Sequence, residues 1–366
     1  MLWDIFCRVI DNHGDLGVCW RLSADLASKG HDVRLWVDDA SALTWMAPEV
    51  HLDQNDWGML QFQRAQVMVR PWQTPLSVQE PVSDVWVEAF GCELPLHFIS
   101  GEQACTPDGA RSALPVWLNL EYLSAEPYVE RSHRLPSPVM SGPLKGRTKW
   151  FFYPGFTDKT GGLIREPKLE EDLKIRLSKP RKQGQNQISL QKTLLFCYEP
   201  VALAEALQLN AFRADGHQWQ VAQGRGALAF DEAMASLPKD SQNLRFSKIP
   251  PLSQSEFDKC LADSDFNFVR GEDSLVRALW AGKAFVWHIY PQEDGAHAPK
   301  LNAFLDWLEA PESLRRFHLR WNGLSTEPLP DVDLPAWEAC AVAARRRLMG
   351  QMDLVSQLLQ FVEEKR

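Results

Sequence analysis

The sequence has no apolar run long enough to cross a membrane as a helix and no excess of basic residues. Its formal net charge of −9 at pH 7 argues against a nucleic-acid-binding protein held by phosphate contacts. Asp4 and Arg8 interrupt the apolar start, so no signal peptide is expected. The seven cysteines form no C-x-x-C pair and no regular framework, which favours a reducing, cytoplasmic location. We therefore expect neither nucleic acid nor membrane among the partners.

The glycine pattern G-x-G-x-x-G of dinucleotide-binding proteins is also absent, because Gly14 and Gly17 follow the first predicted strand with G-x-x-G spacing. Asp11 and Asp15 lie between this strand and the next predicted helix. They would repel a phosphate and would suit a cationic or hydroxylic acceptor. Ligands of open α/β sheets bind at the carboxyl ends of strands, which makes this loop a candidate site. The structural alternative is that Asp15 caps the helix and Asp11 makes an Asx-turn.

The chain is long enough for two domains, with 366 residues of which 45% are hydrophobic. Apolar strands alternate with polar or helical links, which is typical of a parallel sheet covered by helices on both faces. We predict strands at 3–9, 33–37, 66–69, 85–89, 116–120, 150–153, 193–198, 219–222, 244–249, 266–269 and 284–288. We predict helices in the second half at 201–209, 257–262, 274–280, 298–308 and 337–364.

A charged, polar stretch between the two halves predicts a domain junction. We expect an N-terminal domain at 1–165, a junction at 166–190 and a second domain at 191–336. Residues 337–366 would form a C-terminal helix able to pack back on the first domain. Two Rossmann-like, doubly wound α/β domains that face a cleft, with such a helix, are typical of two-lobed glycosyltransferases.

A second candidate site lies where a strand, a turn at Gly271 and a helix beginning near Ser274 follow one another. The free N–H groups of a helix start favour an anion, and Arg270 adds positive charge, so the segment suits a diphosphate without a metal. Glu272 could accept a hydrogen bond from a sugar or ribose hydroxyl, or position another group. The alternative is a capping array in which Asp273 and Ser274 serve the helix and Arg270 is paired on the surface.

Aromatic residues end other strands of the second half. Phe196 and Tyr198 end its first predicted strand, and Gln254 and Phe257 follow a later one. Rings and an amide suit a nucleobase, although core packing is the alternative for each ring taken singly. The acids and the histidine of residues 289–297 suggest a metal, but one short loop rarely supplies enough ligands. We therefore expect no metal.

Three segments, Ile10–Arg21, Phe268–Ser274 and Tyr290–His297, together resemble the elongation factor P arginine rhamnosyltransferases, the EarP family. The resemblance extends over nearly the whole chain, although His13 stands where the family has an aromatic residue such as Phe. It implies an inverting, cytoplasmic glycosyltransferase of the GT-B type. Such an enzyme would move L-rhamnose from dTDP-β-L-rhamnose to an arginine of elongation factor P, which helps ribosomes stalled at consecutive prolines. No metal or other cofactor is implied.

The resemblance also implies roles for individual residues. Asp11, Asp15 and Glu272 would be the essential carboxylates, with Asp15 as general base. The implied donor-binding residues are Asn12, Gly14, Gly17, Phe196, Tyr198, Gln254, Phe257, Arg270, Gly271, Asp273 and Ser274. Carboxylates are needed because a guanidinium stays protonated at neutral pH and its lone pairs are delocalised. The alternatives are a nucleotide-sugar-dependent transferase with a small-molecule acceptor, and a two-lobed binding protein without catalytic activity.

Overall fold

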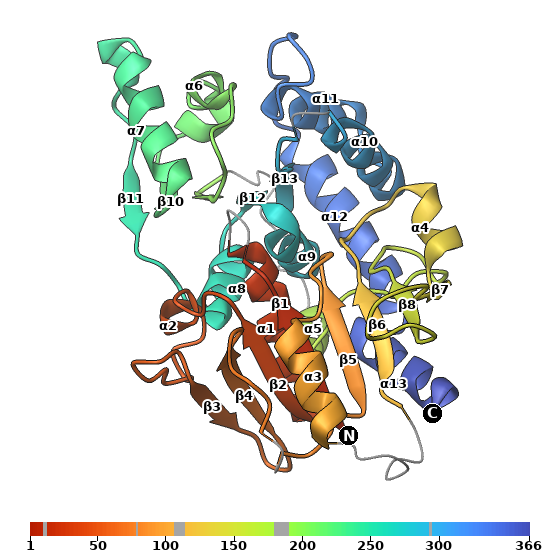
Figure 1. The fold of residues 1–366 in the computed structure, drawn as a ribbon. Coiled ribbons are helices and arrows are strands. Elements are labelled where there is room, and N and C mark those ends of the chain that lie inside the picture. The colour runs from red at the N-terminus through yellow and green to blue at the C-terminus, as the bar shows by residue number, and fades with distance from the viewer. Residues whose placement is uncertain (10–12, 78–79, 106–113, 179–189, 293–294) are drawn as a thin grey trace. The chain divides into compact units, whose positions relative to one another are not determined.

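The computed structural model describes residues 1–9, 13–77, 80–105, 114–178, 190–292 and 295–366. The chain divides into two compact units, coloured in chain order in Figure 1. The first unit comprises Met1–Glu170 and Gln351–Arg366, and the second comprises Glu171–Gly350. The chain passes from the first unit to the second within helix α5 (Pro167–Ser178), which lies in the segment predicted as a junction.

The first unit is built on an eight-stranded sheet in the order β3-β4-β2-β1-β5-β6-β8-β7. Its strands are β1 (Leu2–Cys7), β2 (Asp32–Val37), β3 (Gly58–Gln61), β4 (Gln66–Pro71), β5 (Val85–Ala89), β6 (Val116–Leu120), β7 (Pro136–Pro138) and β8 (Thr148–Phe152). The central strands are parallel to one another, and the edge strands β3 and β7 are antiparallel to their neighbours. The strand order reverses at β1, which lies between β2 and β5.

Helices cover both faces of this sheet (Figure 1). They are α1 (Gly14–Ser28), α2 (Leu43–Met46), α3 (Leu96–Cys105), α4 (Pro127–Ser132), α5 and α13 (Leu354–Lys365). On one face, Trp3, Ile5 and Cys7 of β1 join a buried cluster with residues of α1 and α13. On the other face, the rings of Phe6 and Phe98 of α3 lie 4.7 Å apart. The alternation of side chains along a strand therefore gives this sheet two buried faces.

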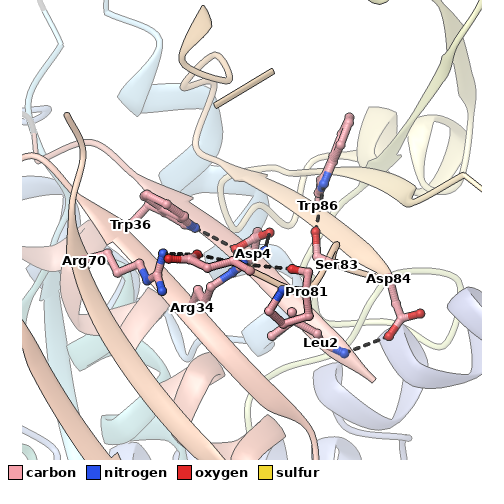
Figure 2. A network of polar contacts seen from close by, with 10 residues as sticks. Leu2, Asp4, Arg34, Trp36, Arg70, Pro81, Ser83, Asp84 and Trp86 are labelled. Atoms are coloured by element: carbon pink, nitrogen blue, oxygen red, sulfur yellow. Dashed lines mark hydrogen bonds and ion pairs between the residues drawn. The ribbon is translucent and has the colours of Figure 1, made fainter. Parts of the chain in front are cut away.

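The α3 face of the first sheet also buries charge (Figure 2). Asp4 accepts hydrogen bonds from Nε of Arg34 at 2.6 Å and from Nε1 of Trp36 at 2.7 Å. Glu80 continues the network, since its Oε2 lies 3.4 Å from Nη1 of Arg34 and 2.6 Å from Nη1 of Arg70. Asp4 and Arg34 are only 0% and 1% exposed, so each charge depends on the other to compensate for lost hydration.

The second unit is built on a five-stranded, wholly parallel sheet in the order β11-β10-β9-β12-β13. Its strands are β9 (Lys192–Leu195), β10 (Gln218–Ala222), β11 (Phe246–Ile249), β12 (Phe266–Arg270) and β13 (Ala284–His288). Its helices are α6 (Leu203–Ala206), η1 (Asn210–Arg213), α7 (Arg225–Ser236), η2 (Lys239–Ser241), α8 (Gln254–Asp263), α9 (Gly271–Ala281), α10 (His297–Leu308), α11 (Glu312–Trp321) and α12 (Leu334–Met349). The order reverses at β9, and the core is aromatic: the Phe268 ring lies 4.2 Å from Trp321 and 5.9 Å from Trp219.

The prediction of one helix over 337–364 was wrong, because the segment forms two helices, α12 and α13. Gly350 is the C-cap residue of α12, and Asp353 begins α13 by accepting the N–H of Ser356 at 3.0 Å. The two helices belong to different units, since the division falls between Gly350 and Gln351. Both helices carry buried apolar residues, and the break between them is only a few residues long, which is why the sequence pattern suggested a single element.

Other differences are smaller. The helix predicted at 201–209 is reduced to the short α6. The sequence analysis did not predict the edge strands β3 and β7, or helices α7 and α11. The prediction of two doubly wound α/β domains is confirmed by the two sheets and their strand orders.

Candidate active site

The strand order marks a candidate ligand site in each unit. A doubly wound sheet binds its ligand outside the carboxyl ends of the strands, where the strand order reverses. In the second unit this position lies between β9 and β12. Phe196 and Tyr198 come directly after β9, and Arg270 is the last residue of β12. The fold therefore brings together residues that the sequence had suggested separately.

Arg270 lies between two aromatic rings. Its Cζ is 4.6 Å from the centroid of Phe196 and 4.9 Å from that of Tyr198, and its Nη1 donates to the Cys197 carbonyl at 3.3 Å. Within the described parts of the chain, no carboxylate forms an ion pair with it. Burial lowers the pKa of this guanidinium, although arginine remains charged in proteins. A largely buried positive charge without a paired anion is suited to bind a phosphate.

The turn after Arg270 is shaped by its own backbone. Gly271 has φ +67°, and a Cβ there would lie 3.6 Å from the Tyr198 hydroxyl. Helix α9 begins at Gly271 rather than near Ser274. Ser274 is buried, and its hydroxyl accepts the Arg270 N–H at 3.0 Å and donates to the Arg270 carbonyl. The Ser274 hydroxyl therefore holds the strand–helix turn. Arg270 is the N-cap residue of α9, and its side chain makes no capping hydrogen bond. The sequence analysis offered a surface ion pair of Arg270 as an alternative, and the described residues form no such pair.

Helix α8 supplies the other face of the site. Ser253 and Glu256 form a complete capping box at its start. Gln254 is its first residue, and Phe257 lies one turn further, with its ring 5.2 Å from Phe196. Residues three apart share a helix face, so the amide and the ring belong to the same side of α8.

An ion pair fixes α8 against α9. Nη2 of Arg277 lies 2.6 Å from Oδ2 of Asp258, and the guanidinium is 4% exposed. Phe257 lies in α8 beside Asp258, and Arg270 directly precedes α9, so the ion pair joins the two helices that carry these residues. The sequence did not suggest this role for Arg277.

Arg225 and His288 were also missed. Cζ of Arg225 lies 5.3 Å from the Tyr198 ring, and its Nε and Nη2 each lie 2.5 Å from an oxygen of Glu199. Arg225 begins α7 between two glycines, and a Cβ on Gly226 would lie 2.8 Å from the carbonyl oxygen of Cys197. In the sequence, a strand followed by glycine and arginine is the pattern that could have identified Arg225.

His288 ends β13 beside the same tyrosine. Its ring lies 5.3 Å from that of Tyr198, and burial lowers the pKa of His288 to about 3, so the imidazole is neutral. Its Nδ1 is buried without a hydrogen-bond partner in the described structure. The positive charge of the site therefore comes from the arginines.

Glu272 forms an ion pair. Its Oε1 lies 2.6 Å from Nζ of Lys300, which is in the first turn of α10. Both side chains are about one-fifth exposed, at 19% and 20%. The lysine fixes the carboxylate beside the turn at Gly271. Lys300 had no sequence signal, since a lysine in an amphipathic helix is ordinary. Asp273 lies in the same first turn of α9.

The corresponding position of the first unit is acidic. Asp15 lies in the first turn of α1, and Oη of Tyr122, which follows β6, lies 3.4 Å from its Oδ2. The N-cap residue is His13, so the suggestion that Asp15 caps this helix was wrong. A Cβ on Gly14 would meet nothing within 4 Å, and the Gly17 N–H closes the first turn on His13.

Two predicted site residues, Asp11 and Asn12, lie outside the described residues. Among the residues that are described, no group of three or more His, Cys, Asp or Glu side chains could hold a metal ion. The described helices include none that is long and apolar enough to cross a membrane.

The two doubly wound sheets, together with the relatives and the solved structure described next, define the class: the protein is a glycosyltransferase with the GT-B fold. The family model described as Elongation-Factor P (EF-P) rhamnosyltransferase EarP matches residues 3–363, and the chain belongs to this family. The resemblance noted in the sequence is thereby confirmed.

Curated relatives and a solved structure agree. The chain is 40% identical to the protein-arginine rhamnosyltransferase of Pseudomonas putida KT2440, over 83% of this chain and 80% of the relative. It is 36% identical to that of Pseudomonas aeruginosa PAO1, over 98% of both chains. A solved structure from work on EarP-mediated arginine glycosylation of translation elongation factor EF-P covers 100% of this chain and 99% of its own, with 25% identity and a TM-score of 0.61.

Proposed function

We propose that this protein is an inverting protein-arginine rhamnosyltransferase that moves L-rhamnose from dTDP-β-L-rhamnose to an arginine of elongation factor P. The observation that carries the proposal is Arg270, a largely buried guanidinium between two aromatic rings at the start of α9. Family membership supports the same reaction. We place the reaction in the cytoplasm, where it would support translation of polyproline stretches.

The second unit would hold the donor. The rings of Phe196 and Phe257 offer a stacking surface for thymine, and the Gln254 amide could read its edge. Arg270 and the N–H groups at the start of α9 would bind the diphosphate. The Lys300-paired Glu272 would accept a hydrogen bond from a hydroxyl of the sugar.

The first unit would supply the acceptor carboxylate, Asp15. A guanidinium nitrogen forms the bond to C1 of rhamnose while the bond from C1 to the diphosphate oxygen breaks. The electron pair of that bond leaves with dTDP, and a guanidinium proton passes to Asp15. Arg270 and the helix start stabilise the charge on the departing diphosphate. A single displacement of this kind inverts C1.

This arrangement requires no metal for the leaving group. We expect full activity in excess chelator, since the diphosphate charge would be met by Arg270 and the start of α9. The measurement is transfer in the presence of EDTA, with and without added magnesium. Activity that disappears with EDTA and returns with magnesium would contradict this part of the proposal.

The test of the whole proposal is mass spectrometry of elongation factor P after incubation with the protein and dTDP-rhamnose. We expect the added mass of one deoxyhexose on a single arginine. Reactions with UDP-glucose in place of the donor, and without the protein, are the controls. Unmodified elongation factor P together with transfer to a small acceptor would favour the alternative transferase.

A further inference from the structure

A turn in the first unit holds an aromatic residue in an unfavourable backbone conformation. Phe90 and Gly91, directly after β5, have φ of +58° and +75°. The N–H of Cys92 donates to the carbonyl of Ala89 at 3.2 Å, which closes a four-residue turn around them. Turns with positive φ at both central residues favour glycine, asparagine or aspartate. A bulky residue there is strained, and such strain concentrates at functional sites.

The strained turn brings Phe90 onto Tyr122. Their ring centroids lie 4.8 Å apart with an interplanar angle of 24°, so the rings are stacked. Two backbone hydrogen bonds fix the pair: Phe90 N–H donates to Leu120 at 2.8 Å, and Glu121 N–H donates to Phe152 at 3.0 Å. Tyr122 nevertheless remains 40% exposed. An exposed, rigid aromatic surface is therefore held at the carboxyl ends of β5 and β6.

The same tyrosine reaches the acceptor carboxylate. Oη of Tyr122 lies 3.4 Å from Oδ2 of Asp15. Catalytic hydrogen bonds are often this long without substrate and shorten when it binds. One residue thus offers a ring face and a hydroxyl beside the candidate base. Phe90 also packs against the core of the first unit, but Tyr122 is 40% exposed and is not a member of that core, so packing explains Phe90 and does not explain the position of the Tyr122 ring and hydroxyl.

We propose that the stacked pair of Phe90 and Tyr122 is the binding surface for the acceptor guanidinium, and that the Tyr122 hydroxyl positions Asp15. This inference rests on the proposed function and names how the acceptor is recognised. A guanidinium is planar and weakly hydrated, so it stacks on an aromatic face while its edge donates hydrogen bonds to a carboxylate. A lysine ammonium is compact and strongly hydrated, so the same surface selects arginine over lysine.

The kinetic test separates the ring from the hydroxyl. Phe90→Gly keeps the turn, because glycine accepts positive φ, but it removes the supporting ring. We expect KM for elongation factor P to rise by about fivefold to thirtyfold with kcat nearly unchanged, from the size of a guanidinium–aromatic contact. Tyr122→Phe keeps the ring, and we expect its kcat to fall by roughly tenfold with KM nearly unchanged, the size of one lost hydrogen bond.

Tyr128→Phe is the matched control, since this tyrosine of the same unit is 41% exposed. We expect it to keep both kinetic constants. Melting temperatures and dTDP titrations of all variants show whether the fold and the donor site are intact. Because Phe90 also packs against the core, Phe90→Gly should change the melting temperature in either case, and an unchanged KM for the acceptor is the result that would make Phe90 merely structural.

A binding measurement keeps this inference separate from the proposed function. Saturation-transfer NMR would detect methylguanidinium on the wild-type protein, with methylammonium as the matched cation. We expect a signal for methylguanidinium only, and its loss in Tyr122→Leu. Equal signals in wild type and Tyr122→Leu would overturn the binding surface even if rhamnose is transferred. A protein that binds methylguanidinium through Tyr122 but transfers no rhamnose would overturn the proposed function alone.

Discussion

The two units share one strand order and differ in the charge that they present at its reversal. The runs β4-β2-β1-β5-β6 and β11-β10-β9-β12-β13 have the same order relative to the chain. At the reversal of the first unit lies Asp15, with Glu121 directly after β6, where burial raises the pKa of this glutamate. At the reversal of the second unit lie Arg270 and Arg225. Topology sets where a ligand binds, and the residues that follow each strand set its charge.

The interiors differ as well. The first sheet buries the ion pair of Asp4 and Arg34 beside rings such as Trp36, whereas the core of the second sheet holds stacked rings such as Trp219 and Phe268. A buried ion pair adds little net stability but is costly to break, while rings contribute by their area. The two units should therefore respond differently to substitution and to pH.

The largest expected effect comes from removing the carboxylate of Asp15 in the acidic site of the first unit. Asp15→Asn removes the group that would accept the proton, so the rate of transfer should fall by roughly 10²–10⁴-fold. Affinity for dTDP should persist, because the proposed nucleotide contacts lie in the second unit. Single-turnover transfer to elongation factor P is the measurement, with thermal melts beside it. A variant that melts normally, binds dTDP and transfers at the wild-type rate would remove Asp15 from the mechanism.

The next effect concerns the buried charges of the first unit. Asp4→Ala removes the closest carboxylate of the buried Arg34 and leaves Glu80 3.4 Å away, so it should lower the free energy of unfolding by about 3–5 kcal/mol. Asp231→Ala is the control, because Asp231 forms a surface pair with Lys248 and is 48% exposed. That control should lose less than about 1 kcal/mol. Urea unfolding measures the free energy of unfolding of both variants. Similar losses would show that the Asp4–Arg34 pair contributes no more than a solvent-exposed ion pair.

A smaller effect tests the positively charged site of the second unit. Arg270→Ala should weaken dTDP binding by about 1.5–3 kcal/mol, the size of a charge-assisted hydrogen bond. Arg245→Ala, at a guanidinium 72% exposed, should leave it unchanged. Calorimetric titration distinguishes them. Unchanged affinity in Arg270→Ala, with a normal melting temperature, would exclude this arginine from the donor site.

The smallest effect, taken per pH unit, sharpens the comparison by pH. His318 of the second unit donates from Nδ1 to Leu314 at 2.9 Å and accepts the Trp287 N–H at 3.0 Å, and burial lowers its pKa from 6.5 to about 4. The unfolded chain therefore binds more protons below pH 6.5. The contribution of His318 to the free energy of unfolding should therefore decrease by about 1.4 kcal/mol per pH unit as the pH falls from 6.5 towards the pKa of the folded state. Hydrogen exchange of β13 measures it, and His318→Gln should reduce the loss.

The pH dependence of stability expected from Asp25 of the first unit has the opposite sign to that expected from His318. Burial raises the pKa of this carboxyl from 3.8 to about 6, despite its ion pair with Lys29. The folded state holds the proton more tightly, so this group's contribution is present at low pH and is lost as the pH rises through 6. Hydrogen exchange of α1 should show protection that increases on acidification in the wild type and increases less in Asp25→Asn. An equal response in both proteins would contradict the assignment.

Much of this comparison could be predicted from the sequence, because apolar runs mark central strands and turn residues mark their ends. Arg270, Phe196 and Tyr198 were found in this way, since strand ends carry ligands whatever the partners are. The short edge strands escaped prediction because they are half exposed and lack an apolar run. Lys300 escaped because its partner Glu272 is 28 residues away in the chain, and local patterns carry no signal for such a contact.

Helix α7 illustrates a different limit. The glycines at 224 and 226 favour a turn, yet the second is required inside the helix because α7 approaches Cys197 too closely for a Cβ. A tertiary contact here overrides the helix propensity of the residue. The strain at Phe90 is similar, since no propensity predicts an aromatic residue with positive φ.

The separation of α12 from α13 has a consequence for how the first unit completes its fold. Leu354, Leu358 and Phe361 of α13 are buried in the core of the first unit, and this helix follows the whole second unit in the chain. The second unit is therefore an insertion, since it extends from Glu171 to Gly350 and residues of the first unit lie on both sides of it. The first unit can fill its core only after the inserted unit has been synthesised, and until α13 docks, the apolar surface that it covers is exposed to solvent.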